Sequence, residues 1–150
     1  GVLSRGRTSR LHRNLVQSGL VQSMSAYMYT RALDNLFVVE AVPQAPHTVG
    51  EVEAAFQQEL ESLLAEPPAA WELEKVRKNL EADFVRSLNY PLSLARALAQ
   101  AEAFRGSWRN YDERARYQVV TAADVQRVAG EYLTRERRTV ATLVQKEVKP

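Results

Sequence analysis

The sequence predicts an α+β fold in which about three antiparallel strands pack on five to six helices. Two short segments near the start and one at the end have the β-branched or alternating character of strands. Long segments with apolar residues every three or four positions fill the middle, and two of them carry complete helix start signals. The 150 residues, of which 45% are apolar and 25% charged, suit one globular domain spanning 1–150.

The first third of the chain is predicted to form a short helix and a hairpin. Residues 7–18 form the helix, which ends at Gly19 because glycine readily adopts the left-handed conformation of a helix end. Residues 21–29 alternate apolar and polar side chains, as a half-buried strand does. Leu36–Val42 is almost wholly apolar and β-branched. The short connection, which includes Asp34, favours an antiparallel pair.

The rest of the chain is predicted to be helical until its last strand. Two helices begin with a capping box, in which Thr48 answers Glu51 and Thr121 answers Asp124. Proline pairs and glycines separate the segments. In order, the helices are the one that follows Thr48 and is broken by Pro67-Pro68, then Ala70–Leu88, Ser93–Phe104, 110–119 and Thr121–Leu133; the strand is Thr139–Val144.

Three strands and about six helices make a thin sheet with exposed edges. Natural proteins avoid long bare sheet edges because unpaired backbone groups recruit other chains. We therefore expect either that a partner supplies further strands or that the chain is a piece of something longer. Self-association through the sheet edges is expected when no partner is present.

Charge is unevenly distributed along the chain, although the formal net charge is only +2. The first 33 residues hold five arginines and no acid, and residues 34–74 hold nine acids and no base. An arginine-rich start is compatible with a nucleic-acid-binding arm or an organelle transit segment. Leu11, Leu15 and Val16 instead form a packing stripe, which favours a folded segment. No run of about 18 apolar residues is present, so no membrane span is expected.

The sequence carries no recognisable catalytic or metal-binding apparatus. It has no cysteine, and its two histidines, His12 and His47, belong to no zinc motif of the H-x-x-E-H type or its inverse. His47 and Glu51 stand four residues apart, but His47 precedes a helix cap and is expected in an exposed loop. No glycine-rich phosphate loop is present. The carboxylates of the central helices are expected on solvated faces: Glu59, Glu61, Glu66, Glu72 and Glu74.

Several segments, in order, resemble the insulinase/pitrilysin class of zinc metallopeptidases, which includes the mitochondrial processing peptidase. The strongest are S-R-L leading into G-L-x-x-S-x-S, from Ser9 to Ser25, and T-A-x-D-V-x-x-V-A-x-x-Y-L, from Thr121 to Leu133. Between them lie LFVVEA, EVEAAFQQELESLL, WELEKVRKNLEADFVRSL and LARALAQAEAF. The resemblance is to the later, zinc-free domain of these enzymes, without about its first fifty residues.

The resemblance implies a companion domain rather than the cutting domain. In this class, paired α+β domains close a chamber around an extended peptide, and one of them holds the zinc. It implies no cofactor in this chain, zinc in the parent or partner domain, and a zinc-bearing metallopeptidase domain or subunit as partner, with a peptide as substrate. The family's substrate-backbone arginine and tyrosine are not carried over, because Val16 and Gln22 occupy the comparable positions.

Three arginines are the candidate contacts to the peptide chamber or the partner: Arg7, Arg10 and Arg13. Arg10 matches the arginine of the family's S-R-L segment and is expected first to form an ion pair or cap a helix. Two alternatives stay open, an inactive scaffold or assembly subunit of the same fold and a nucleic-acid-binding module. The second would use Arg5 with those three arginines, and Tyr27 and Tyr29 as stacking groups. We expect a cytoplasmic location, with an organelle matrix as the alternative.

Overall fold

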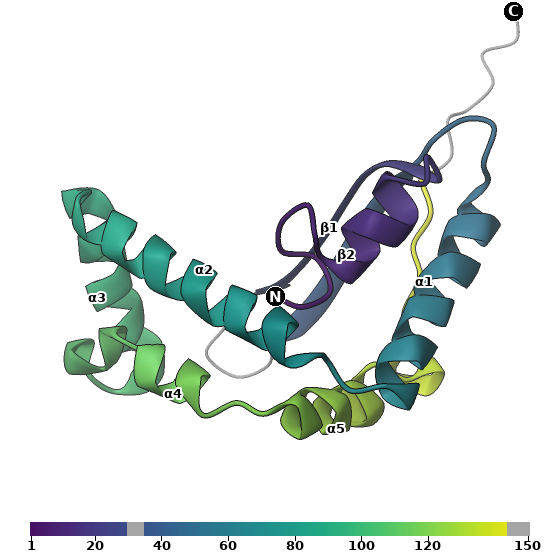
Figure 1. The fold of residues 1–150 in the computed structure, drawn as a ribbon. Coiled ribbons are helices and arrows are strands. Elements are labelled where there is room, and N and C mark those ends of the chain that lie inside the picture. Colours follow the sequence, from purple (N-terminus) through teal and green to yellow (C-terminus); the bar gives the residue numbers. More distant parts are fainter. Residues whose placement is uncertain (30–34, 144–150) are drawn as a thin grey trace, which may run out of the picture.

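The computed structural model describes residues 1–29 and 35–143 and confirms the α+β fold class. Two arms rise from a common base (Figure 1). One arm contains a β-hairpin, the N-terminal segment and helix α1, and the other contains α2, α3 and α4, while α5 lies at the base. The elements are η1 (His12–Val16), β1 (Val21–Tyr29), β2 (Leu36–Pro43), α1 (Val49–Ala65), α2 (Ala70–Leu88), α3 (Pro91–Arg105), η2 (Trp108–Tyr111), α4 (Arg114–Gln118), α5 (Ala122–Tyr132) and η3 (Arg135–Arg137).

Strands β1 and β2 form the predicted antiparallel hairpin. Tyr29 pairs with Leu36 at one end, and Val21 pairs with Pro43 at the other, where the register shifts between Val21 and Ser23. Side chains alternate between the two faces of the hairpin, and one face lies against the core. Met24 is among the side chains of this face that pack on the core. Residues 30–34 of the connection, including Asp34, lie outside the described part of the chain.

The prediction of a third strand is wrong within the described residues. The sheet has two strands, and residues 139–143 adopt no regular structure; Val144 lies outside the described part. The backbone is extended at Arg138, whose guanidinium binds the Glu53 carboxylate with Nη2 2.6 Å from Oε1. A β-prone segment becomes a strand only when a neighbouring strand accepts its hydrogen bonds, and the described residues provide none here.

The first helix is shorter and wider than predicted. Residues 10 and 11 are α-helical, and His12–Val16 follows as η1 with the hydrogen-bond spacing of a π-helix. A turn precedes it, in which the Ser9 hydroxyl donates to the Gly6 carbonyl oxygen at 2.7 Å. This arrangement buries Leu11 and Leu15 completely. Gly19 ends the segment with φ of 81°, the left-handed conformation that was predicted for it.

The helix starts follow the predicted signals closely. Both capping boxes are present, at Thr48 with Glu51 and at Thr121 with Asp124. Helix α3 begins two residues earlier than predicted, because Pro91 is tolerated in a first helical turn. The predicted helix over 110–119 is divided between η2 and α4.

In the described part of the chain, no helix is both long enough and apolar enough to cross a membrane.

The hydrophobic core lies entirely in the hairpin arm and the base. It joins η1, the hairpin, α1 and α5 through Leu3, Leu11, Leu15, Val21, Val52, Leu60, Leu63 and Ala129. Leu88, the last residue of α2, is exposed, although apolar residues at steps of three and four along this helix favour a buried stripe. The core therefore holds η1 against α1, and the α2–α4 arm extends away from it.

Candidate functional site

The N-terminal segment is joined to the start of α2 by a buried ion pair. Arg10 binds Glu72 through two parallel hydrogen bonds, with Nε 3.0 Å from Oε1 and Nη2 2.9 Å from Oε2. Their side chains are only 12% and 5% exposed. The planar guanidinium matches the carboxylate in this geometry, which gives a charge-assisted pair of fixed orientation. Arg10 thus forms the ion pair that was expected of it.

Glu72 also serves as the cap of α2. Its Oε2 accepts a hydrogen bond from the backbone N–H of Ala69 at 3.0 Å. The solvated position predicted for Glu72 is wrong, because this first-turn residue turns back onto the N-terminal segment and is buried there. The only sequence signal for this capping role is the position of Glu72, three residues after the cap residue Ala69. The signal is weak because Ala69 lacks the hydroxyl that completes a capping box.

The two charges stabilise each other's ionised form. The hydrogen bond from Arg10 is the main cause that lowers the pKa of Glu72, and the Ala69 N–H adds to it, while burial acts in the opposite direction. The same hydrogen bond raises the pKa of Arg10. The pair is therefore charged throughout the physiological range and acts as a positioning contact between the N-terminal segment and α2.

The lowered pKa predicts a loss of stability in acid. A carboxylate whose pKa is depressed on folding contributes stability above its unfolded pKa of about 4.3 and loses it as the pH falls through the folded value. Glu72→Gln should therefore destabilise the protein at pH 7, and the difference from the unmodified chain should shrink below about pH 4. Urea unfolding at several pH values measures this. Glu61→Gln is the control, since the exposed Glu61 side chain lies away from the pair and only accepts a hydrogen bond from the Gln57 side chain.

Arg13 lies beside the Arg10–Glu72 pair, whereas Arg7 does not. Arg13 and Arg10 both line a shallow depression of about 200 Å³ between η1, α1 and the start of α2. Its other lining residues are Asn14, Glu59, Ser62, Glu66, Trp71 and Glu72. Arg7 is exposed, and its backbone carbonyl accepts a hydrogen bond from the Gln17 side chain at 3.4 Å. The three candidate arginines therefore form no single converging site.

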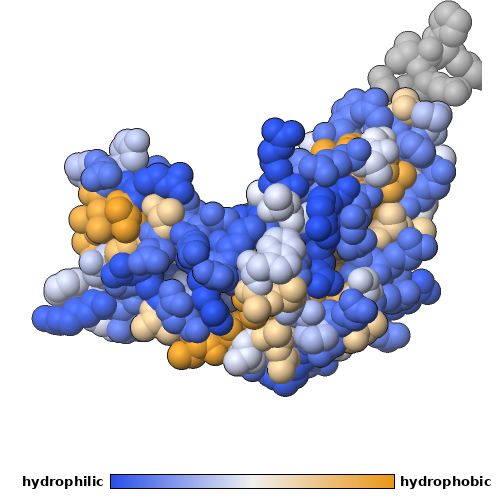
Figure 2. All heavy atoms as spheres, viewed as in Figure 1, coloured by the Kyte–Doolittle hydropathy of each residue, from blue (hydrophilic) through white to orange (hydrophobic). Residues whose placement is uncertain are grey.

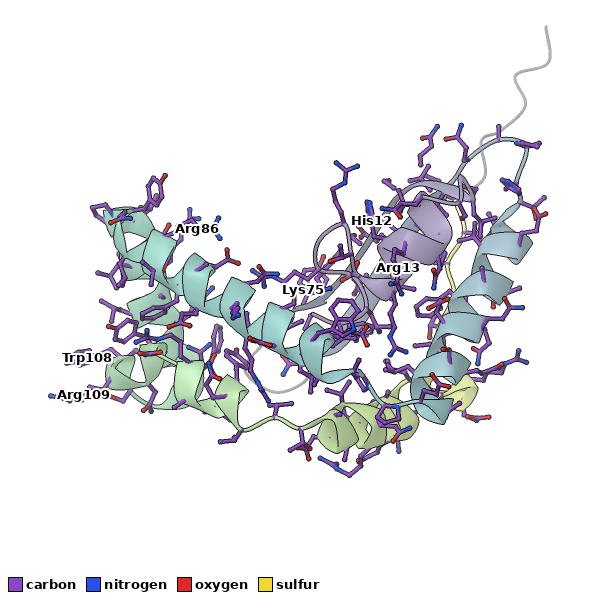
Figure 3. All side chains as sticks on the ribbon, viewed as in Figure 1. His12, Arg13, Lys75, Arg86, Trp108 and Arg109 are labelled. Carbon is purple, nitrogen blue, oxygen red and sulfur yellow. The ribbon has the colours of Figure 1, made fainter. Side chains whose placement is uncertain are left out.

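A larger hollow lies between the two arms and is lined largely by hydrophilic residues (Figure 2). Lys75 on α2 donates to the Thr8 carbonyl and hydroxyl, both at 3.2 Å, and Arg5 forms an ion pair with Asp83 further along α2. His12 and Arg86 lie on opposite sides of this hollow (Figure 3). Neither Lys75 nor Asp83 could be singled out from the sequence, because neither stands in a motif and both contact residues far away in the chain.

The remaining sequence candidates assemble no reaction centre in the described residues. His47 Nδ1 lies 3.7 Å from Glu51 Oε1, but the Glu51 carboxylate is already the cap of α1. Tyr27 and Tyr29 pack edge to face, and the Tyr27 hydroxyl donates to Glu40 at 2.6 Å. Within residues 1–29 and 35–143, no three histidine, aspartate or glutamate side chains are placed to hold a metal ion together.

Comparison with known proteins places this architecture in a family. A family model described as the peptidase M16 inactive domain matches residues 1–80, which is more than half of the chain. Comparison with curated proteins gave no significant match.

Solved structures have the same fold. A "putative zinc protease" from Bordetella pertussis Tohama I is 28% identical with a TM-score of 0.78; the match covers 92% of this chain and 77% of that one. The inactive peptidase domain of a "putative zinc protease" from Bordetella parapertussis is 25% identical with a TM-score of 0.80; it covers 99% of this chain and 82% of that one.

A protease from Helicobacter pylori shares the fold, with a TM-score of 0.76 at 23% identity. The match covers 91% of this chain and 33% of that larger one. The resemblance drawn from the sequence segments is confirmed by these findings. The chain belongs to the family of peptidase M16 inactive domains.

Proposed function

We propose that this chain is the non-catalytic partner of a zinc metallopeptidase, docking on a zinc-bearing domain or subunit and completing the chamber that holds the peptide. The observation that carries the proposal is the match to an inactive peptidase domain across the segment that contains the Arg10–Glu72 pair. The chemistry it would serve is attack of a zinc-activated water on a peptide bond. The zinc ligands would belong to the partner.

The hollow between the two arms supports a role in holding an extended ligand. Its walls are formed by the N-terminal segment and by α2, and three contacts link these walls across the sequence: Arg10 with Glu72, Lys75 with Thr8, and Arg5 with Asp83. Such cross-links stiffen a surface, and a pre-organised surface loses less entropy when it binds. Arg10 would therefore shape this wall rather than touch the peptide.

Arg7 and Arg13 are the candidate contacts to the partner or peptide. Both side chains are exposed, and neither has a hydrogen-bond or ion-pair partner among the described residues. Charged groups at the rim of an interface act mainly on the association rate and on partner choice. Reversing their charge should therefore weaken docking without disturbing the fold.

The test combines this chain with a zinc-bearing H-x-x-E-H chain of the same family. We expect zinc-dependent cleavage of an unstructured peptide only when both are present. Arg7→Glu with Arg13→Glu should reduce that activity, whereas the control Arg127→Glu, at an exposed position of α5, should leave it unchanged. Equal cleavage by the zinc-bearing chain alone would contradict the proposal.

Metal analysis provides a second, independent check. The chain by itself should bind no stoichiometric zinc after incubation with the metal and dialysis, because a zinc site needs three or four convergent ligands. Elemental analysis that finds one zinc per chain would assign the metal to this chain and overturn the division of roles.

A further inference from the structure

Residues 4–10 form a loop that leaves the hydrophobic core and returns to it. The loop is closed at its base, where the Leu11 N–H donates to the Leu3 carbonyl oxygen at 2.9 Å, and both leucines are buried in the core. The Ser4 hydroxyl also fixes it to β1, donating to the Ala26 carbonyl oxygen at 2.9 Å. A compact loop whose two ends lie close together is held at its base and presents its side chains to a neighbouring element. We call residues 4–10 the bridging loop, because they contact α2.

The bridging loop contacts α2 at three points, in antiparallel order. The pairs, in order along α2, are Arg10 with Glu72, Thr8 with Lys75, and Arg5 with Asp83. Glu72 and Asp83 are eleven positions apart, which is about 16 Å along a helix. The three contacts therefore run from the start of α2 to a point well along it.

These contacts become more exposed with distance from the start of α2. The side chains of Arg10 and Glu72 are 12% and 5% exposed, whereas those of Arg5 and Asp83 are 39% and 46% exposed. The Asp83 carboxylate is also shared with Arg86, 2.9 Å away. Exposed ion pairs contribute little and are screened by salt, whereas buried pairs are screened much less. The inner contact is therefore firm, and the outer ones are easily released.

Little apolar surface joins the α2–α4 arm (residues 70–119) to the hairpin arm. All residues of this arm are described, and none of them belongs to the hydrophobic core or packs on it. Its buried residues are Glu72 and Ala101, and the half-buried Val76 lies beside the Gly1 backbone. Relative motion is the expected behaviour of two parts of a chain that share no large hydrophobic interface.

The chain passes between the two arms at two short connections near the base. Residues 66–69 join α1 to α2, and residues 119–121 join α4 to α5. Glu72 lies just beyond the first connection, and Arg77 Nη2 donates to the Val120 carbonyl oxygen of the second at 2.7 Å. Hinge motions are absorbed by a few residues at the ends of secondary-structure elements. The fixed points of the arm are therefore at the base, and its far end is formed by the end of α2 and by α3 (Figure 1).

We infer that the α2–α4 arm pivots at the buried Arg10–Glu72 pair, and that the bridging loop is a salt-sensitive latch that holds the arm close to the hairpin arm. With Arg5 and Lys75 engaged, the arm is closed. Loss of these two outer contacts lets the arm swing outward, which widens the hollow between the arms (Figure 2). The device lies within this chain and does not depend on a zinc-bearing partner.

Paired spin labels measure the separation of the arms. The chain has no cysteine, so Ala54→Cys on α1 with Ala99→Cys on α3 places one label on each arm. A second pair, Ala99→Cys with Ala115→Cys on α4, reports on the α2–α4 arm alone. All three alanines are exposed, so the labels should leave the packing intact. Double electron–electron resonance gives the distance distribution of each pair.

Arg5→Ala with Lys75→Ala removes both outer contacts and leaves the pivot in place. We expect the distribution between the arms to broaden and its mean to move to a longer distance, while the distribution within the α2–α4 arm stays unchanged. Raising the salt concentration from about 0.01 M to about 1 M shortens the Debye length from about 30 Å to about 3 Å. The unmodified chain should then open in the same direction as the variant.

Arg7→Ala with Lys78→Ala is the matched control. It removes the same charge as the latch variant but no contact between the arms, because Lys78 pairs with Glu74 within α2 and the Arg7 side chain has no partner among the described residues. The control should keep the distance distribution of the unmodified chain. Circular dichroism verifies that every variant retains its helix content.

Three results would overturn the inference. The first is a distribution between the arms that neither the latch variant nor high salt alters. The second is an equal shift in the latch variant and in the matched control, which would trace the effect to net charge. The third is a shift of the same size in the pair within the α2–α4 arm, which would mean that the arm unfolds rather than pivots.

Discussion

Arg10→Ala should lower the free energy of unfolding by about 3–5 kcal/mol, the usual cost of removing one partner from a buried ion pair. The substitution leaves the Glu72 carboxylate, 5% exposed, without its two charge-assisted hydrogen bonds. An uncompensated buried charge destabilises far more than the lost attraction alone. Urea unfolding at pH 7 measures the change, and the melting temperature should fall with it.

Two comparisons separate this effect from a general sensitivity of the segment. Arg13→Ala removes an exposed arginine three positions away and should change the stability by less than about 0.5 kcal/mol. The double variant Arg10→Met with Glu72→Leu removes both charges and should be more stable than Arg10→Ala, because no buried charge remains. Equal losses for Arg10→Ala and Arg13→Ala would show that the pair is not buried in solution.

Leu63→Ala should cost about 2–5 kcal/mol, because it opens a cavity in the core. Leu63 is 1% exposed and lies in the cluster that joins η1, the hairpin, α1 and α5. Its neighbour Leu64 is 40% exposed. Leu64→Ala is therefore a control of identical chemistry at the next position, and we expect it to cost well under half as much.

Denaturant midpoints of the two leucine variants provide the measurement. A larger effect at Leu64 than at Leu63 would mean that α1 is rotated relative to the face described for it. Comparable effects would mean that both leucines are covered in solution.

The start signals of the helices could be predicted because they act locally. A threonine three residues before an acid satisfies the first backbone N–H groups wherever the rest of the chain lies, and Thr48 and Thr121 both cap their helices. The hairpin followed from alternation in β1 and from the apolar run in β2, since side chains of a strand point to opposite faces in turn.

The errors arose where the outcome depends on distant contacts. Residues 139–143 have the composition of a strand, yet no neighbouring strand is present in the described chain to pair with them. Glu72 has the composition of a solvated helix residue, yet Arg10, 62 positions earlier, draws it into a buried pair. The apolar stripe of α2 has the spacing of a core helix, yet it extends beyond the core.

The sequence by itself determined the α+β class, the helix caps and the hairpin. It did so because propensity, capping and side-chain periodicity are properties of neighbouring residues. Only the tertiary structure decided that Arg10 faces inward while Arg7 and Arg13 remain exposed, and that the helices separate into a buried half and an exposed arm. Burial and charge pairing depend on tertiary contacts, and those contacts are made by residues that lie far apart in the sequence.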